Sequence, residues 1–211
     1  NITGNVRTVV AYQVNAEVMA ATGGRLMGPV GDDALSLAGV STDTRTLSSG
    51  QLFVALSGDS FDGHDHLAAA AAAGATLALV EKAATAPAGL SLLRVASCLE
   101  ALGALAHKHL ERCKAAGARV VALTGSAGKT TTKEAIGALL RALDAGPVHV
   151  TAGNLNNLVG VPHMALAATR EHRFIVLELG TNRPGEIARL ARMVEPDVAL
   201  LTLISAAHTE G

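Results

Sequence analysis

The segment Thr124–Thr131 has the residue types and the spacing best suited to chemistry in this sequence. It reads Thr-Gly-Ser-Ala-Gly-Lys-Thr-Thr and directly follows the aliphatic run 120–123. A strand that ends in a glycine-rich turn and continues into a helix presents backbone N–H groups to a phosphate. We therefore predict that Lys129 reaches the terminal phosphates of ATP and that Thr130 holds Mg²⁺. The predicted nucleotide-binding residues are Thr124, Gly125, Ser126, Ala127, Gly128, Lys129, Thr130 and Thr131.

This loop is shorter than the usual phosphate-binding loop, in which four residues separate the first glycine from the Gly-Lys pair. The usual spacing would require glycine where this chain has Leu123. The alternative interpretation is a glycine-containing turn with a solvated lysine. Because strand, glycines, lysine and threonine all agree, the sequence favours the phosphate-binding loop.

Two further candidates belong to other predicted strands. Glu178 is a carboxylate inside the apolar run 174–179, and His208 follows the apolar run 198–204. Parallel strands bind ligands at their carboxyl ends, where the phosphate-binding loop also lies. A buried carboxylate is costly unless it is paired or bound to a cation, so we predict that Glu178 binds magnesium. A salt bridge to a lysine or arginine is the alternative, and a lone loop histidine such as His208 is usually solvated.

The loop 151–157, Thr-Ala-Gly-Asn-Leu-Asn-Asn, follows a third predicted strand. Its asparagine amides are able to bind sugar or phosphate oxygens. They are equally suited to forming turns, since asparagine tolerates left-handed backbone conformations. The residues alone leave these two roles open.

The elements that must position these residues alternate between strand and helix after Gly117. We predict strands at 119–124, 148–151, 174–179 and 198–204, and helices at 129–143, 158–168 and 184–194. Uniformly apolar strands that alternate with helices are typical of a parallel sheet covered on both faces. The predicted fold class is therefore α/β, with a mostly parallel, doubly wound sheet in this part of the chain.

The residues before Gly117 predict a small α/β module with shorter elements. We predict helices at 8–22, 68–73 and 97–116, and strands at 52–56, 76–80 and 92–95. Ser97 and Glu100 have the spacing of a capping box. His107 and His109 are two residues apart and face different sides of the third helix, which favours solvated histidines over metal ligands. The loop 57–66 is a candidate binding loop, and the predicted domains are 1–117 and 118–211.

Composition excludes several function classes. The 211 residues are 49% hydrophobic with a net charge of −1, and the absence of a basic run argues against nucleic-acid binding. Cys98 and Cys113 lie on one predicted helix, about 22 Å apart, which is too far for a disulfide. The longest uncharged apolar run, 67–80, is too short to span a bilayer. We expect a monomeric cytoplasmic protein.

Several motifs together resemble the Mur ligase family. The run 124–134 resembles the ATP loop of these enzymes, and the loop 151–157 with Gly160-Val161-Pro162 resembles the stretch specific to the members that add D-alanyl-D-alanine. Further matching segments are 177–182, 185–187, 207–208 and 210–211, and in the N-terminal module 42–45, 52–56 and 61–64. The resemblance covers nearly the whole chain.

This resemblance implies an ATP-dependent ligase that adds D-alanyl-D-alanine to UDP-N-acetylmuramoyl-tripeptide, through an acyl phosphate, in peptidoglycan synthesis. It implies catalytic roles for Lys129, Glu178 and His208. Thr130 and Glu178 would hold one magnesium ion, and His208 would help to hold a second. Residues 1–117 would bind the UDP precursor and 118–211 would bind ATP. The implied substrate-binding residues are Thr42, Asp43, Thr44, Arg45, Asn154 and Asn157.

The sequence departs from the family pattern around His208. The family usually has Asn in place of Leu203, Gly-Pro in place of Ser205-Ala206 and Leu in place of Thr209. The resemblance also implies further central strands and a C-terminal domain beyond residue 211, so we expect these residues alone to be inactive. The alternatives are a non-catalytic fragment that binds nucleotide or UDP precursor, and another ligase of the same superfamily such as folylpolyglutamate synthase.

Overall fold

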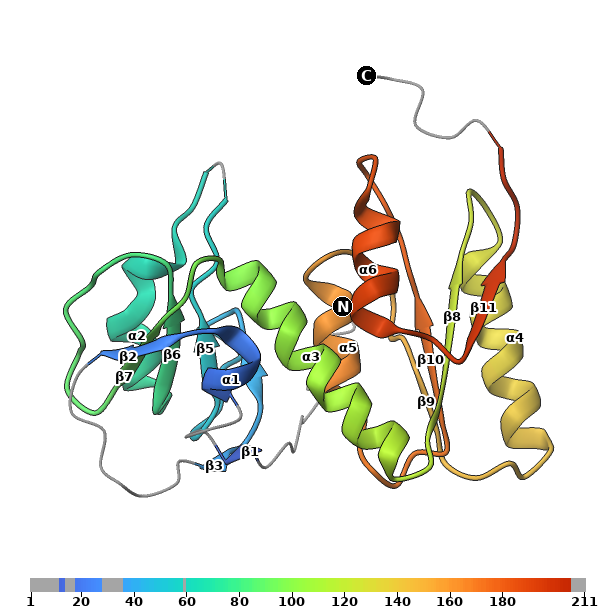
Figure 1. The fold of residues 1–211 in the computed structure, drawn as a ribbon, viewed down its shortest axis with the longest axis horizontal. Coiled ribbons are helices and arrows are strands. Elements are labelled where there is room, and N and C mark those ends of the chain that lie inside the picture. The colour runs from blue at the N-terminus through green and yellow to red at the C-terminus, as the bar shows by residue number, and fades with distance from the viewer. Residues whose placement is uncertain (1–11, 14–17, 28–35, 59, 206–211) are drawn as a thin grey trace. The chain divides into compact units, whose positions relative to one another are not determined.

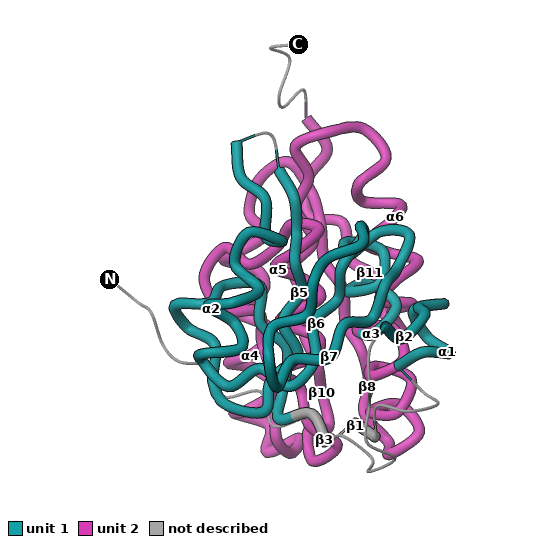
Figure 2. Tube along the Cα trace, turned by 90° about the vertical axis from the view of Figure 1, so that its left-hand side faces the viewer, with its two compact units in different colours: residues 1–105 teal, residues 106–211 magenta. Residues whose placement is uncertain are grey.

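The computed structural model describes residues 12–13, 18–27, 36–58 and 60–205. The chain divides into two compact units, 1–105 and 106–211 (Figure 2). This division falls inside helix α3 (Cys98–Ala115), whereas the sequence analysis places the domain boundary just after that helix. Among the described residues, no helix combines the length and the apolar composition needed to cross a bilayer.

The first unit contains a five-stranded sheet in the order β2-β7-β6-β5-β4. Only β2 runs antiparallel to its neighbour. Helix α2 (Leu67–Ala72) packs with this sheet around a core that includes Phe53, Leu67 and Leu92. The strands are β2 (Arg25–Met27), β4 (Val40–Ser41), β5 (Leu52–Val54), β6 (Leu77–Val80) and β7 (Ser91–Arg94).

The prediction of a helix over residues 8–22 is wrong at residues 12–13, which form a strand. Strand β1 (Tyr12–Gln13) pairs antiparallel with β3 (Ser36–Leu37), and helix α1 (Met19–Thr22) lies within the predicted range. The run 8–12 contains the β-branched and aromatic residues that strands favour, and short apolar runs do not discriminate between helix and strand. Gly23 ends α1 with a left-handed φ of 63°, as predicted.

The second unit contains a four-stranded parallel sheet in the order β11-β8-β10-β9. Glu178, the last residue of β10, lies beside Leu123 of β8. The register therefore brings Glu178 and the segment after β8 together at the carboxyl ends of the strands. The strands are β8 (Arg119–Thr124), β9 (Val148–Val150), β10 (Phe174–Glu178) and β11 (Val198–Leu201), close to the predicted ranges.

Helices cover both faces of this second sheet (Figure 1). The chain moves from β8 to β9 in one direction across the sheet and returns through β10 to β11 in the other. Right-handed crossovers therefore place α4 (Lys129–Ala142) on one face, and α5 (Gly160–Ala167) and α6 (Glu186–Val194) on the opposite face. This confirms the doubly wound fold, and its change of direction between β8 and β10 marks the expected ligand crevice.

Strand β11 departs from the expectation of a buried strand. All four of its residues are exposed, because it forms an edge of the described sheet. Its hydrogen-bonded pairing with β8 nevertheless fixes where the chain leaves the sheet. The segment 202–205, which follows β11, therefore lies beside the phosphate-binding loop.

The helix α3 begins at the predicted cap, where Ser97 Oγ accepts a hydrogen bond from Glu100 N at 3.3 Å. The prediction that His107 and His109 are solvated is wrong for His109, whereas His107 is partly exposed. His107 Nδ1 lies 2.9 Å from the Met193 carbonyl oxygen, and His109 is buried with Nε2 at 2.7 Å from the Ala168 carbonyl oxygen. Because a carbonyl only accepts, both rings donate, and their role is structural.

His149 on β9 is partly buried and donates from Nε2 to the Met164 carbonyl at 2.8 Å. Burial lowers the pKa of His149 to about 4, so the folded state disfavours its protonation. As pH falls from about 6.5 to about 4, the unfolded state takes up this proton first and the free energy of unfolding falls. The full effect of this one group is about 3 kcal/mol.

We therefore expect that His149→Gln, which keeps an N–H donor, will lose less stability than the wild type over this pH interval. Urea unfolding of both proteins at a series of pH values measures the difference. Other titrating groups are common to both proteins and cancel in that difference. Parallel stability curves for the two proteins would contradict the assignment.

Candidate functional site

The predicted phosphate-binding loop connects β8 to α4 through two glycines with positive φ. Gly125 has φ 147°, and Gly128, the N-cap of α4, has φ 79°. Among the described residues, no side chain caps α4, and the first amides of a helix have no partner within it. These amides and the positive end of the helix dipole form a site for an anion.

Lys129 is held over this loop. Its Nζ donates to the Gly125 carbonyl oxygen at 2.6 Å, and its side chain is half-buried. This contact folds the lysine back across the turn, so the ammonium group lies at the carbonyl of the first glycine of the loop. Such a placement is the one predicted for a lysine that contacts terminal phosphates.

The segment after β11 braces the other side of the loop. Thr202 Oγ1 donates to the Ala127 carbonyl at 2.6 Å, and Ser126 N donates to the Leu203 carbonyl at 2.8 Å. A Cβ atom at Gly125 would lie only 2.2 Å from Thr202 Oγ1. The close approach of this segment therefore requires glycine at position 125, which the sequence supplies.

Glu178 lies beside the loop with an exposed fraction of only 2%. Thr130 Oγ1 donates to its Oε2 at 3.1 Å, and Asn156 Nδ2 donates to its Oε1 at 2.9 Å. The backbone N–H of Glu178 donates to Thr151 Oγ1 at 3.0 Å. The structure thus brings together the two side chains, Thr130 and Glu178, that the sequence analysis proposed as magnesium ligands.

A fully buried lysine completes this cluster. Lys133 on α4 is 0% exposed, and its Nζ lies 3.8 Å from Glu178 Oε2. The same ammonium group donates to the Gly153 carbonyl at 3.3 Å and lies 3.2 Å from Glu134 Oε1. Lysine is rarely buried, so composition gave no reason to select it. Its position one helical turn after Lys129 was the available signal.

The donor atoms of Thr130 and Glu178 fit a magnesium ion. Magnesium prefers hard oxygen ligands and typically binds through one or two protein groups while it keeps water or phosphate oxygens. A hydroxyl and a carboxylate 3.1 Å apart at the end of the phosphate-binding loop supply that set. Within the described residues, no group of three His, Cys, Asp or Glu side chains forms another candidate metal site. His208 lies outside the described residues.

The asparagine loop has two kinds of contact. Asn157 Oδ1 accepts hydrogen bonds from Val159 N at 3.1 Å and from Gly160 N at 2.8 Å, which caps the start of α5. Asn154 is exposed. Asn156, which the sequence analysis did not select, is the residue that contacts Glu178. The two roles that the sequence leaves open therefore fall on different residues: Asn157 stabilises the turn, and Asn156 contacts the buried carboxylate.

The cap predicts a measurable stability difference at Asn157. Asn157→Ala removes the acceptor and should lower the free energy of unfolding by about 1 kcal/mol. Asn157→Asp keeps an acceptor at the helix N-terminus, where a negative charge is favourable, and should unfold like the wild type. Chemical denaturation of the three proteins measures both effects. Equal stability of the alanine variant and the wild type would refute the capping role.

The predicted substrate-binding residues 42–45 form a turn after β4. The carboxylate of Asp43 accepts from the backbone N–H and the side chain of Arg45, with Nη2 to Oδ2 at 2.6 Å. This partner lowers the pKa of Asp43. The guanidinium group is largely exposed, with 87% of its side chain accessible. The charge pair fixes the turn while the arginine remains accessible to a ligand.

The loop after β5 is held by its own charged residues. His64 is buried, with Nδ1 2.6 Å from Asp62 Oδ1, and its Nε2 accepts from Glu81 N at 2.9 Å. Lys82 also pairs with Asp62, and these contacts lower the pKa of the Asp62 carboxyl group. The Asp-Gly-His part of the matched motif therefore stabilises the loop itself.

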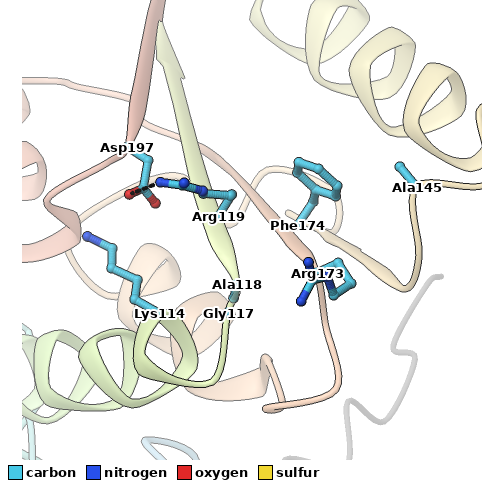
Figure 3. A pocket seen from close by; sticks show the side chains of 8 residues that line it. All are labelled: Lys114, Gly117, Ala118, Arg119, Ala145, Arg173, Phe174 and Asp197. Carbon is cyan, nitrogen blue, oxygen red and sulfur yellow. Dashed lines mark hydrogen bonds and ion pairs between the residues drawn. The ribbon is translucent and has the colours of Figure 1, made fainter.

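A separate pocket of about 480 Å³ lies at the opposite end of the strands of the second sheet, where β8 and β10 begin (Figure 3). Its lining includes Arg119 and Phe174, the first residues of β8 and β10, together with Asp197 just before β11. Asp197 pairs with Arg119 at 3.4 Å and accepts from Val120 N at 2.7 Å. The phosphate-binding loop follows the other end of β8, so this pocket is no part of that site.

Two family models match adjoining parts of the chain. Residues 36–123 match the catalytic domain of the Mur ligase family, and residues 123–211 match the Mur ligase middle domain. Together the two matches include the phosphate-binding loop, the asparagine loop and Glu178.

Relatives and solved structures agree with these matches. The UDP-N-acetylmuramoyl-tripeptide–D-alanyl-D-alanine ligase of Escherichia coli is 44% identical over 179 residues, which are 84% of this chain and 38% of that ligase. The enzyme of the same name from Haemophilus influenzae is 41% identical over 184 residues, which are 86% and 39% of the two chains. The chain thus spans about two fifths of the length of these relatives.

A crystal structure of MurF from Acinetobacter baumannii has a TM-score of 0.84 at 38% identity and covers 95% of this chain and 43% of that one. MurF from Thermotoga maritima in complex with ADP has a TM-score of 0.71 at 34% identity, with 81% and 38% covered. With both sheets, the phosphate-binding loop and both family models in agreement, the chain belongs to the Mur ligase family.

Proposed function

We propose that this chain provides the UDP-precursor-binding domain and part of the ATP-binding domain of a ligase. The ligase joins D-alanyl-D-alanine to UDP-N-acetylmuramoyl-tripeptide and consumes ATP in peptidoglycan synthesis. The contact between Thr130 of the phosphate-binding loop and the buried Glu178 carries the proposal, because it joins a phosphate site to a cation site. The names and similarity of the relatives support the choice of substrates.

In the proposed reaction, the terminal carboxylate of the tripeptide attacks the γ-phosphate of ATP and gives an acyl phosphate and ADP. The amine of D-alanyl-D-alanine then attacks the acyl carbon, and the tetrahedral intermediate loses phosphate. Lys129 and the loop amides stabilise the negative charge on the phosphoryl group during transfer. Thr130 and Glu178 would hold magnesium, which neutralises phosphate charge when bound. His208 is proposed to help hold a second ion.

The two parts of the chain receive different substrates in this proposal. Residues 1–117 bind the UDP portion, with Thr42, Asp43, Thr44 and Arg45 as the proposed contacts, and residues 118–211 bind ATP. The exposed Arg45 suits a diphosphate, because a guanidinium group binds phosphate oxygens in pairs. Asn154 and Asn157 are proposed to orient the substrate, Asn157 through the amide N–H₂ that the helix cap leaves available. Consumption of ATP and two free, buried cysteines fit a cytoplasmic protein, and we propose that it is a monomer.

Removing the loop lysine tests the ATP site. Lys129→Ala in the full-length enzyme should lower ATP-dependent turnover at least a hundredfold, because the transferring phosphoryl group loses a positive charge. The side chain is only half-buried, so the thermal unfolding temperature should change little. Lys108→Ala, which removes an exposed lysine on α3, is the matched control. Phosphate release by Lys129→Ala at a near-normal rate would exclude the proposed role.

Neutralising the buried carboxylate tests the cation site. Glu178→Gln keeps the size of the side chain and one of its two acceptor oxygens but removes the charge, so the magnesium concentration for half-maximal activity should rise at least tenfold. Glu111→Gln, at an exposed position on α3, controls for the loss of one negative charge. Magnesium titration of the full-length enzyme gives the answer, and an unchanged requirement would count against Glu178 as a ligand.

The non-catalytic alternative is tested on the 211 residues themselves. Calorimetry with UDP-N-acetylmuramoyl-tripeptide should detect binding if residues 1–117 form the precursor site. Binding without turnover would be expected both for a non-catalytic module and for part of a larger enzyme. Turnover by the full-length enzyme then separates these two possibilities.

A further inference from the structure

We propose that Lys133 is an internal counter-ion for Glu178 that makes cation binding at this site depend on bound nucleotide. When no cation is bound, the lysine neutralises the carboxylate. When nucleotide binds, its phosphates offset the lysine charge and admit the cation. The inference rests on the proposed magnesium site at Thr130 and Glu178, and it assigns a positioning role to a residue outside that pair.

Burial is the first observation. Lys133 is 0% exposed and Glu178 is 2% exposed, so water screens neither charge effectively. A buried charge is stable only when it is paired and hydrogen-bonded. The carboxylate of Glu178 therefore depends on the ammonium group, and any second cation at Glu178 enters a place that already has a positive charge.

The distances indicate that the Lys133 ammonium group and a bound cation would compete for the same oxygen of Glu178. Glu178 Oε2 accepts from Thr130 Oγ1 at 3.1 Å and lies 3.8 Å from Lys133 Nζ. Glu178 Oε1 is engaged by Asn156 at 2.9 Å. A cation held by Thr130 and Glu178 would therefore approach Oε2, the oxygen nearest the lysine. This cation and the Lys133 ammonium group would repel each other strongly, because both are positive and the site is buried.

Lys133 also has two acceptors that do not involve Glu178. These are the Gly153 carbonyl at 3.3 Å and Glu134 Oε1 at 3.2 Å. The ammonium group therefore stays hydrogen-bonded when Oε2 turns toward a cation. The lysine remains in the site as a fixed positive charge, which penalises a metal ion that arrives alone. The same positive charge favours a metal ion that arrives together with the negative charges of a nucleotide.

The consequence is a coupling between two ligands. If nucleotide strengthens cation binding, the cation strengthens nucleotide binding by the same factor. Removing the lysine charge should tighten cation binding in the absence of nucleotide and reduce this coupling. A lysine that only supported the fold would have the opposite effect, because its loss would loosen Glu178 and weaken cation binding.

The test uses Mn²⁺ as a paramagnetic substitute for magnesium, measured by electron paramagnetic resonance with and without ADP on the full-length protein. For Lys133→Met we expect Mn²⁺ alone to bind at least tenfold more tightly than to the wild type. The factor by which ADP strengthens Mn²⁺ binding should fall by a similar amount. Unchanged or weaker binding of Mn²⁺ alone to Lys133→Met would overturn the proposal.

Matched variants make the result specific. Lys133→Arg keeps the charge and should bind Mn²⁺ alone as weakly as the wild type, and Lys108→Met should also match the wild type. If Lys133→Met does not fold, Lys133→Gln, which can still donate to the Gly153 carbonyl, provides the same comparison. If Glu178→Gln leaves Mn²⁺ binding with ADP unchanged, the proposed metal site itself is wrong. If Glu178→Gln weakens Mn²⁺ binding with ADP but Lys133→Met does not tighten the binding of Mn²⁺ alone, only the counter-ion role is refuted.

Discussion

The arrangement of the second unit depends on one buried carboxylate. Glu178 is 2% exposed at the end of a parallel strand, a position that an unpaired charge could not occupy. Its partners come from different parts of the chain, namely Thr130 and Lys133 on α4 and Asn156 in the loop after β9. Satisfying this one group therefore aligns the phosphate-binding loop, the first turns of α4 and the asparagine loop.

Sheet topology makes that alignment possible. The crossover through α4 leaves β8 in one direction, and the chain returns through β10 to β11 in the other, so the connections that follow β8 and β10 lead to opposite faces of the sheet. The pairing of Glu178 with Leu123 places the carboxylate level with the start of the loop. The segment after β11 then braces the loop through Thr202. Local glycine conformation and long-range strand order thus specify the same site.

Sequence patterns predicted the second sheet well because its strands are uniformly apolar and its loops carry strong turn signals. They also selected Thr130 and Glu178, which the structure brings into contact, because those residue types have a specific chemistry at strand ends. They missed Lys133 and misjudged His109, because burial of a polar side chain depends on partners far away in the sequence. They also missed β1, whose strand conformation depends on pairing with β3. Helix and strand are not distinguishable in such a short apolar run.

Both lysines of α4 illustrate how such a site stays folded without relying on a ligand. Lys129 donates to the Gly125 carbonyl at 2.6 Å, and Lys133 donates to the Gly153 carbonyl at 3.3 Å. A backbone carbonyl is a partner of fixed position that carries no full charge, so it satisfies an ammonium group without competing strongly against a phosphate or a carboxylate. The turn therefore holds the ammonium group of Lys129 in place while its interaction with a phosphate stays available, which lowers the reorganisation that binding requires.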